Sequence, residues 1–246
     1  MPDDHPSRLR AAGLIAGLLP AAVAAVESMG ETPGAGPRLF PAEEAVVRTA
    51  GPLRRAEFTA GRLCARAALA RLGVPATPIL PGPAGQPQWP AGVTGSITHC
   101  AGYQACAVAL TTDVAAIGID AERDAGLPAG LLETVATSPE RAWIRRHTAA
   151  GPGVCWDRLL FSAKEAACKL WYPLTGQWLG LHDVVIEPAT IGTFAVRLPG
   201  PVRMTGRWLA RDGLIVTAIT WPPMTPHRPG PALSAEAVHP LGGQPA

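Results

Sequence analysis

The apolar periodicity of the chain changes from helical to strand spacing twice, and this limits the possible folds more than any other feature. Residues 43–72 repeat with helical spacing, and residues 93–110 and 114–119 then alternate as strands do. The second part of the chain repeats this order. Its predicted helices start at Ser138-Pro139-Glu140 and cover residues 157–171, the second ending before Pro173. Its predicted strands are residues 183–187 and a hairpin of residues 202–211 and 214–221 around Asp212-Gly213. This order predicts an α+β fold with two halves and argues against the long βαβ alternation of a Rossmann sheet.

The two predicted halves meet near residues 111–114, where a Thr-Thr-Asp turn separates two strands. We therefore expect an N-terminal half over residues 1–112 and a C-terminal half over residues 113–224. Residues 225–246 are rich in proline, glycine and small side chains, so a disordered tail is expected there. Hydrophobic residues make up 48% of the chain, which is enough apolar material for a real core.

An apolar, alanine-rich run over residues 11–26 follows two arginines and imitates a signal peptide. Asp3 and Asp4 precede this run, Pro20 interrupts it, and no clean cleavage site follows it before Glu27. The run is also too short and too interrupted to span a membrane. We interpret it as an N-terminal helix, and we expect a cytoplasmic protein without a membrane partner.

The net charge and the cysteine content argue against three classes of protein: nucleic-acid binders, disulfide-bonded scaffolds and zinc proteins. The net charge is +2, and neither a basic stripe nor a nucleic-acid-binding motif occurs, so no nucleic-acid partner is expected. The five cysteines are odd in number and lack C-x-x-C spacing, which argues against a disulfide scaffold and against a zinc site. Small buried thiols in a reducing cytosol are the expected role of these residues.

Two carboxylates follow the apolar run at residues 117–119. Asp120 and Glu122 lie two residues apart, so a strand would point both side chains to the same face. Mg²⁺ takes few carboxylates and completes its octahedron with water and substrate phosphate. The pair therefore indicates a possible magnesium site, although two solvated acids at a strand end would give the same pattern.

A second group of polar residues lies on the predicted helix over residues 157–171. Glu165 and Lys169 are four residues apart and share one helical face. They could act as a metal ligand or base and as a phosphate contact, or they could be an ordinary surface pair. Thr98 and His99, in a turn-rich strand end, and the arginines of residues 54–62 could likewise hold a phosphate or only decorate the surface.

The order of these motifs is more specific than any one of them. S-I-T-H, G-I-D-A-E and F-S-A-K-E-A-A-C-K-L-W-Y follow one another between residues 96 and 172. In this combination the chain resembles the 4′-phosphopantetheinyl transferase superfamily, which is marked by G-[IV]-D-x-E followed by [FW]-[SC]-x-K-E-[AS]-x-x-K. Both motifs match at every defined position, and the resemblance covers roughly residues 10–222.

The resemblance is to the long, pseudo-dimeric type that activates siderophore, nonribosomal peptide and polyketide synthetases. It implies a monomer of two similar α+β halves related by a pseudo-twofold axis, with the active site in a cleft between them. It also implies a Mg²⁺-dependent reaction that transfers 4′-phosphopantetheine from coenzyme A to a serine of acyl, peptidyl or polyketide carrier proteins and releases 3′,5′-ADP.

Site residues are carried over from the family only at matching positions. The implied Mg²⁺ ligands are Asp120, Glu122 and Glu165. The residues implied to bind coenzyme A are Arg54, Arg62, Thr98, His99, Lys164 and Lys169. Of these, Lys164 and Lys169 match lysines near the pyrophosphate, and the other four match residues at the 3′-phosphoadenosine end. Glu165 and Lys169 are the implied catalytic residues, with Glu165 as the general base.

Two alternative functions stay open at the level of the sequence. The acids and lysines would also suit a metal-dependent hydrolase of nucleotide pyrophosphates. Relatives often carry basic residues in the loop before a G-x-P segment, whereas residues 81–84 are uncharged here. This departure leaves the strength of coenzyme A binding open and makes a non-catalytic coenzyme A or carrier-binding module conceivable.

Overall fold

Two antiparallel sheets with helices packed against them make up the fold. The computed structural model describes residues 9–10, 13–30, 39–100, 102–150, 153–188 and 192–223. The elements in chain order are η1 (Ala16–Leu18), β1 (Ala24–Met29), α1 (Pro41–Val46), α2 (Pro52–Arg71), β2 (Val93–Cys100), β3 (Tyr103–Leu110), β4 (Ala116–Arg123), α3 (Leu131–Val135), α4 (Ser138–Ala149), α5 (Trp156–Thr175), η2 (Leu181–Asp183), β5 (Val185–Pro188), β6 (Thr193–Arg197), β7 (Arg203–Arg211) and β8 (Leu214–Trp221). The predicted α+β class is confirmed.

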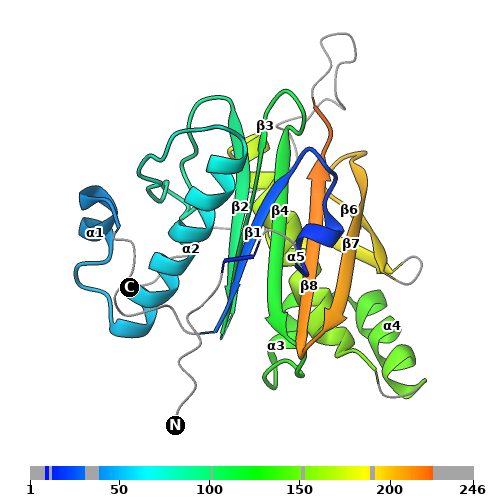
Figure 1. Cartoon of the computed structure of the whole chain (residues 1–246). Helices are drawn as coiled ribbons and strands as arrows, with labels where there is room; N and C mark the ends of the chain where they lie inside the picture. Colours follow the sequence, from blue (N-terminus) through cyan, green and yellow to red (C-terminus); the bar gives the residue numbers. More distant parts are fainter. Residues whose placement is uncertain are drawn as a thin grey trace.

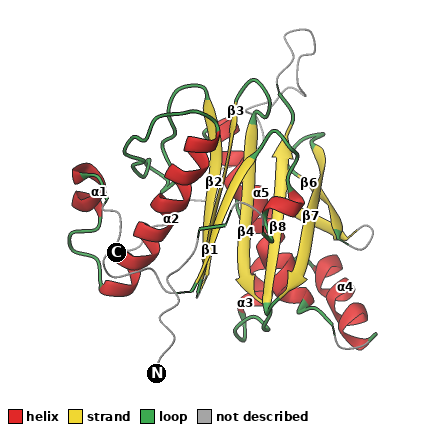
Figure 2. Cartoon of the chain, in the orientation of Figure 1, coloured by secondary structure: helices red, strands yellow, loops and turns green. Residues whose placement is uncertain are grey.

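The first sheet has the strand order β1-β3-β2 and the second has the order β4-β8-β7-β6-β5. Every paired neighbour within them is antiparallel, which agrees with the prediction against a Rossmann sheet. Helix α2 packs on the first sheet and α5 lies behind β4 and β8 of the second (Figure 1). Figure 2 shows the same division, with strands in the middle of the molecule and helices at its flanks.

The two sheets meet where β2 lies beside β4, and side-chain hydroxyls make the contact. The Oγ of Ser96 accepts a hydrogen bond from the backbone N–H of Ile119 at 3.2 Å, and the Oγ1 of Thr98 accepts one from Ala121 at 3.0 Å. Both residue numbers rise by two between the contacts, so β2 and β4 run in the same direction here. This junction fixes the end of β4 against the first sheet.

Helix α5 lies unusually close to β4 because of one glycine. A Cβ atom on Gly118 would come within 1.9 Å of the carbonyl oxygen of Ala166, so only glycine allows this approach. The hydroxyls of Ser162 and Thr217 also lie 2.9 Å apart, between α5 and β8. The helix is thereby fixed across the strand that carries Asp120.

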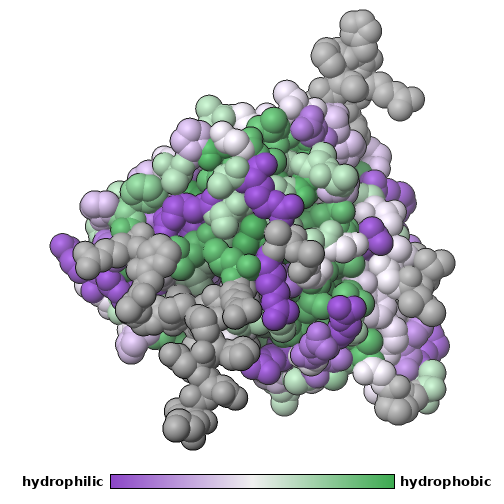
Figure 3. All heavy atoms as spheres, in the orientation of Figure 1, coloured by the Kyte–Doolittle hydropathy of each residue, from purple (hydrophilic) through white to green (hydrophobic). Residues whose placement is uncertain are grey.

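Several predicted elements are confirmed. The hairpin turn has Asp212 and Gly213 both at positive φ, 55° and 73°, as a two-residue turn of this kind requires. Strands β2 and β3 cover the predicted residues 93–110, and the helix predicted from Ser138 begins there, with Thr137 as its N-cap. The face of Figure 1 carries hydrophobic and hydrophilic residues intermixed (Figure 3).

The prediction of a helix over residues 11–26 is wrong in its described part. Residues 16–18 form a single 3₁₀ turn and residues 24–29 form β1. The cause is the buried carboxylate of Glu27, which accepts hydrogen bonds from the backbone N–H groups of Leu14 and Ile15 at 3.0 and 3.1 Å and from the hydroxyl of Tyr103 at 2.8 Å. The chain wraps around this acid instead of continuing as a helix.

Helix boundaries differ from the predictions at two places. The helix predicted over residues 43–72 is split into α1 and α2, because Gly51 caps α2 and Pro52 is its first residue. Helix α5 passes through Pro173 and ends only at Gly176, whose φ is +68°. Pro173 lies in the last turn, so it removes a single backbone hydrogen bond there. Strand β6 was not predicted at all.

Within the described residues, no helix is long and apolar enough to cross a membrane. All five cysteines are free thiols, with Cys64 and Cys106 fully inside the molecule. The predicted tail over residues 225–246 lies outside the described residues.

Candidate active site

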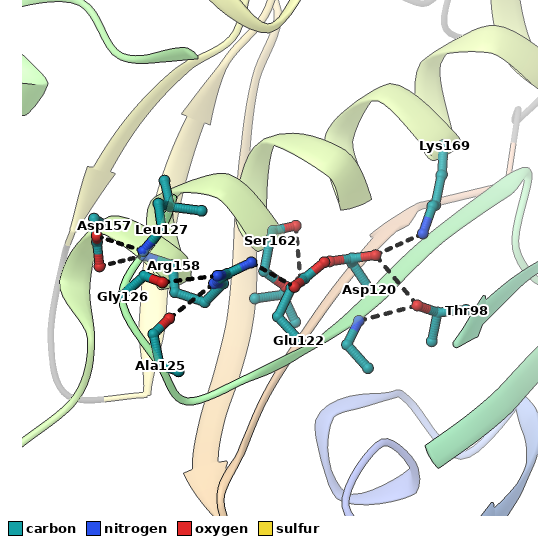
Figure 4. Close-up of polar contacts among 12 residues, drawn as sticks. Thr98, Asp120, Glu122, Ala125, Gly126, Leu127, Asp157, Arg158, Ser162 and Lys169 are labelled. Atoms are coloured by element: carbon teal, nitrogen blue, oxygen red, sulfur yellow. Dashed lines mark hydrogen bonds and ion pairs between the residues drawn. The ribbon is translucent and has the colours of Figure 1, made fainter. Parts of the chain in front are cut away.

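The side chain of Asp120 is the centre of the site, and one of its oxygens has no partner. Asp120 is 3% exposed. Its Oδ1 accepts hydrogen bonds from the Nζ of Lys169 at 2.6 Å and from the Oγ1 of Thr98 at 3.2 Å (Figure 4). Its Oδ2 is buried without a hydrogen-bond partner among the described residues. Because leaving a buried carboxylate oxygen unpaired is costly, this atom indicates a place for a cation or a donor.

Thr98 lies beside Asp120 in the structure, and its place at the 3′-phosphoadenosine end stays a prediction. Its hydroxyl oxygen accepts a hydrogen bond from the backbone N–H of Ala121, and the hydroxyl donates its single proton to the Oδ1 of Asp120. The residue is 2% exposed, so its side chain is already committed to two buried partners. Thr98 thus orients Asp120 and joins the two sheets.

Replacing Thr98 by valine is expected to lower the free energy of unfolding by about 2–3 kcal/mol, because Ala121 and Asp120 would each lose a buried hydrogen bond. Thr98→Ser keeps the hydroxyl and should recover most of this loss. Equilibrium unfolding in urea compares the two variants. Equal stability of the valine and serine variants would contradict the role of the hydroxyl.

Glu122 and Glu165 complete the acidic group. Burial raises the pKa of Glu122, and Asp120 raises it further, while the guanidinium of Arg158 opposes both effects. Burial also raises the pKa of Glu165, with Lys169 lowering it and Asp120 raising it. Asp120 therefore influences both glutamates, as a carboxylate close to two others does. Figure 4 shows the carboxyl group of Glu122 between Arg158 and Asp120.

A cavity of about 270 Å³ opens beside Glu165 and Lys169. Strand β2, helix α5 and the loop over residues 84–89 line it, and Ala84 is the one lining residue that belongs to the uncharged segment over residues 81–84. The aromatic rings of Trp89, Tyr172 and Trp178 face it, and Trp178 is 75% exposed. A cavity with an apolar wall and a charged end suits a ligand that joins an uncharged arm to a phosphate.

Arg54 and His99 lie in contact at the surface, and their binding of a shared ligand stays a prediction. The Nη1 of Arg54 lies 3.2 Å from the Nε2 of His99. Burial lowers the pKa of His99, so its neutral form is favoured and can accept from Arg54. The Oε2 of Glu57 lies 3.7 Å from the Nη1 of Arg54, and its Oε1 lies 3.9 Å from the Nδ1 of His99. Glu57 was not predicted, but its position one helical turn after Arg54 is a sequence signal that could have identified it.

Arg62 has other partners than those predicted. It is 7% exposed, its Nε donates to the carbonyl of Ile79 at 2.8 Å, and its guanidinium lies 4.0 Å from the ring centre of Phe58. Burial lowers its pKa to about 10. These contacts hold the segment after α2 in place, so the assignment of Arg62 to a ligand is not supported.

Lys164 also differs from its predicted role beside a pyrophosphate. Its side chain is 0% exposed, and its Nζ donates to the Oε2 of Glu140 at 2.8 Å and to the carbonyl of Leu181 at 2.9 Å. Glu140 in turn accepts the N–H groups of Thr137 and Ile186 at 2.7 and 2.9 Å. The ammonium group is thus inside a buried network that joins α4, α5 and β5, because the helix turns this residue away from the face of Glu165.

Lys164→Met is expected to lower the free energy of unfolding by about 3–5 kcal/mol, since it leaves the buried Glu140 without its countercharge. Urea unfolding measures this, with the exposed Arg145 changed to Met as the control for loss of a cation. An unchanged urea midpoint together with weaker coenzyme A binding would instead support the assignment made from the sequence.

Arg158 is a site residue that the sequence interpretation missed. Its Nη1 donates to the Oε2 of Glu122 at 2.9 Å. It precedes Glu165 by seven residues, which is two helical turns, so its place on the same face of α5 was a usable signal. Among the described residues, no three histidine, cysteine or acidic side chains already form a metal-binding group.

Comparisons with known proteins identify the family that the chain resembles. Residues 42–109 match the family model for the 4′-phosphopantetheinyl transferase N-terminal domain, and residues 116–214 match that of the 4′-phosphopantetheinyl transferase superfamily. The 4′-phosphopantetheinyl transferase Svp of Streptomyces mobaraensis is 50% identical over 192 residues, which are 74% of this chain and 78% of the relative. The 4′-phosphopantetheinyl transferase PptT of Mycobacterium tuberculosis is 42% identical over 224 residues, 84% of this chain and 97% of the relative. Enterobactin synthase component D of Salmonella typhimurium is 30% identical over 209 residues, 78% and 83% of the two chains.

Proposed function

The chain belongs to the 4′-phosphopantetheinyl transferase superfamily, and we propose that Asp120, Glu122 and Glu165 are its Mg²⁺ ligands. The protein is an enzyme that transfers 4′-phosphopantetheine from coenzyme A to carrier proteins. The observation that best supports the assignment of the site is the Oδ2 of Asp120, which is buried without a hydrogen-bond partner among the described residues, while the Oδ1 of the same carboxylate contacts the cavity residue Lys169.

The acidic group fits a magnesium ion in its donor chemistry. Mg²⁺ prefers oxygen ligands and takes one or two carboxylates together with waters and substrate phosphate. Asp120 offers a buried oxygen without a partner, and the raised pKa values of Glu122 and Glu165 indicate acids that would gain from a nearby cation. When bound, Mg²⁺ would offset the negative charge of the pyrophosphate oxygens.

Glu165 and Lys169 carry out the remaining chemistry in this proposal. The hydroxyl oxygen of a carrier serine attacks the phosphorus on the pantetheine side of coenzyme A, and the bond from that phosphorus to the leaving 3′,5′-ADP breaks. Glu165 accepts the serine proton, since its carboxylate borders the same cavity as Lys169. Lys169 lines the same cavity and stabilises charge on the phosphoryl oxygens.

The two ends of coenzyme A are assigned to separate parts of the surface. We place the 3′-phosphoadenosine end at Arg54 and His99, where a basic side chain and a neutral imidazole are in contact. We place the pantetheine arm in the cavity beside Trp89 and Trp178. Ala84, the last residue of the uncharged segment over residues 81–84, lines this cavity and would contact the arm rather than a phosphate.

The halves predicted from the sequence, residues 1–112 and 113–224, stay part of the proposal. Each contains one sheet and one helix of twenty residues, α2 and α5, in support of two similar units with a pseudo-twofold relation and a cleft between them. By its name, one relative is a component of an enterobactin synthase. We therefore propose carrier domains of siderophore, peptide or polyketide synthetases as acceptors. Monomeric state and cytoplasmic location stay predictions.

Intact-protein mass spectrometry of an apo peptidyl carrier domain tests the function. The carrier is incubated with the enzyme, coenzyme A and Mg²⁺, and a parallel sample contains EDTA. We expect the carrier to gain one phosphopantetheine group in the first sample only. Release of 3′,5′-ADP without a carrier would favour the pyrophosphate hydrolase, and coenzyme A binding without any transfer would favour the non-catalytic module. Transfer that persists in EDTA would contradict the magnesium assignment alone.

A further inference from the structure

Arg158 contacts both the acidic group and the loop that follows β4. Its Nη1 donates to the Oε2 of Glu122, its Nε to the carbonyl of Ala125 and its Nη2 to the carbonyl of Gly126, each at 2.9 Å (Figure 4). A guanidinium is planar and offers its donors in a fixed fork, so three acceptors in these directions define its orientation. Its side chain is 16% exposed, which limits competition from water.

The place of Arg158 does not depend on Glu122. Two further hydrogen bonds tie the start of α5 to the same loop. The N–H of Cys155 donates to the Oδ1 of Asp124, and the N–H of Leu127 donates to the Oδ2 of Asp157, each at 2.9 Å. The loop over residues 124–127 is therefore fixed to α5 from both sides, so the carbonyl groups that accept from the guanidinium are held in place by other hydrogen bonds.

From this arrangement we propose that Arg158 is a positioning residue that holds one oxygen of Glu122 and leaves the other to serve the metal. The inference rests on the proposed magnesium site. Arg158 and Glu165 share a face of α5, so the helix that supplies one acid also fixes a second acid from β4. The two strand carboxylates are then held from opposite directions, Asp120 by Thr98 and Glu122 by Arg158.

The charge of a guanidinium near a cation site acts on metal affinity in the opposite direction to its positioning role. Its positive charge repels a divalent ion, so a side chain that acted only through its charge would weaken metal binding. A positioning role predicts the reverse, because partners of ligating carboxylates commonly contribute 10–100-fold, as an order of magnitude, to metal affinity. The sign of the change on removing Arg158 therefore separates the two effects.

Binding of Mn²⁺ to the full chain, measured from the free-ion electron paramagnetic resonance signal without a carrier protein, gives a readout independent of turnover. We expect Arg158→Met to weaken Mn²⁺ binding about 10-fold or more. The Mn²⁺ affinity of Arg158→Lys should lie between those of the wild type and Arg158→Met, since an ammonium group keeps the charge but cannot reach all three acceptors. In a chain that already carries Glu122→Gln, the added R158M change should have no further effect.

Arg141 provides the matched control, because it donates to the carbonyl of Ala136 and the hydroxyl of Ser138 rather than to a carboxylate. Arg141→Met should leave Mn²⁺ binding unchanged, and urea unfolding of every variant identifies any loss of fold. Unchanged or tighter binding by R158M would overturn the positioning role. If Glu122→Gln itself bound Mn²⁺ like the wild type, the magnesium assignment would fail and the role of Arg158 with it. Transfer to a carrier by the wild type is a separate measurement, so failure of the transferase function remains distinguishable.

Discussion

Asp120→Asn is expected to lower the rate of phosphopantetheine transfer about 10²–10³-fold or more, the loss that follows removal of one positioned charge-stabilising group. The substitution keeps the volume of the side chain and its hydrogen-bond acceptor, but it removes the charge of the most buried acid in the site. It also removes the like-charge effect of Asp120 on Glu122 and Glu165, so the pKa values of both should fall.

The rate is measured by mass spectrometry of the carrier over time, with urea unfolding to verify the fold. Asp113→Asn is the control, because Asp113 is an exposed acid in the turn that precedes β4. Near wild-type transfer by the D120N variant would exclude Asp120 from the metal site. An equal loss in the D113N variant would point to a general effect of charge rather than to the site.

The strands and the helices with clear ends could be predicted from local sequence, and the failures have a tertiary cause. The hairpin at Asp212 and Gly213 was predictable because its turn chemistry is local. The N-terminal segment was not, since its conformation depends on Glu27 and on Tyr103, which lies 76 residues away in sequence. An alanine-rich run indicates a helix only when no distant acceptor competes for its backbone N–H groups.

The candidate site divides in the same way. The acids of the G-I-D-A-E and K-E motifs were found from spacing, and the structure brings them into one electrostatic group. Lys164 and Arg62 were assigned to coenzyme A because they match family positions that the resemblance implies to contact this ligand. Sequence spacing does not reveal burial, and the carboxylate of Glu140 and the carbonyl of Ile79 hold these two side chains inside the fold.

Helix geometry explains why the neighbouring Lys164 and Glu165 have different surroundings. Adjacent residues of an α-helix point about 100° apart, and Gly118 lets α5 pack closely against β4. Lys164 points into the network of Glu140, and Glu165 borders the cavity with Lys169. Of these two consecutive charged residues, Lys164 is therefore expected to affect mainly stability, and Glu165 is expected to affect transfer without affecting stability.

Glu165→Gln is expected to lower the turnover number about 10²–10⁴-fold, the usual contribution of a general base. The amide keeps the shape of the side chain and its place in the cavity wall, but it cannot accept the serine proton. Single-turnover transfer to an apo carrier domain measures the chemical step.

Binding measurements separate the two roles assigned to Glu165. As a base alone, Glu165 could be replaced by glutamine with Mn²⁺ affinity and coenzyme A affinity both retained. As a metal ligand as well, it should lose Mn²⁺ affinity in the E165Q variant to an extent comparable with the E122Q variant. Glu133→Gln, an exposed acid in the first turn of α3, controls for the loss of one negative charge. Transfer by E165Q at the wild-type rate would remove Glu165 from the mechanism. The serine proton would then have to pass to another acid of the site. Asp120 already accepts a hydrogen bond from Lys169, and Glu122 accepts one from Arg158.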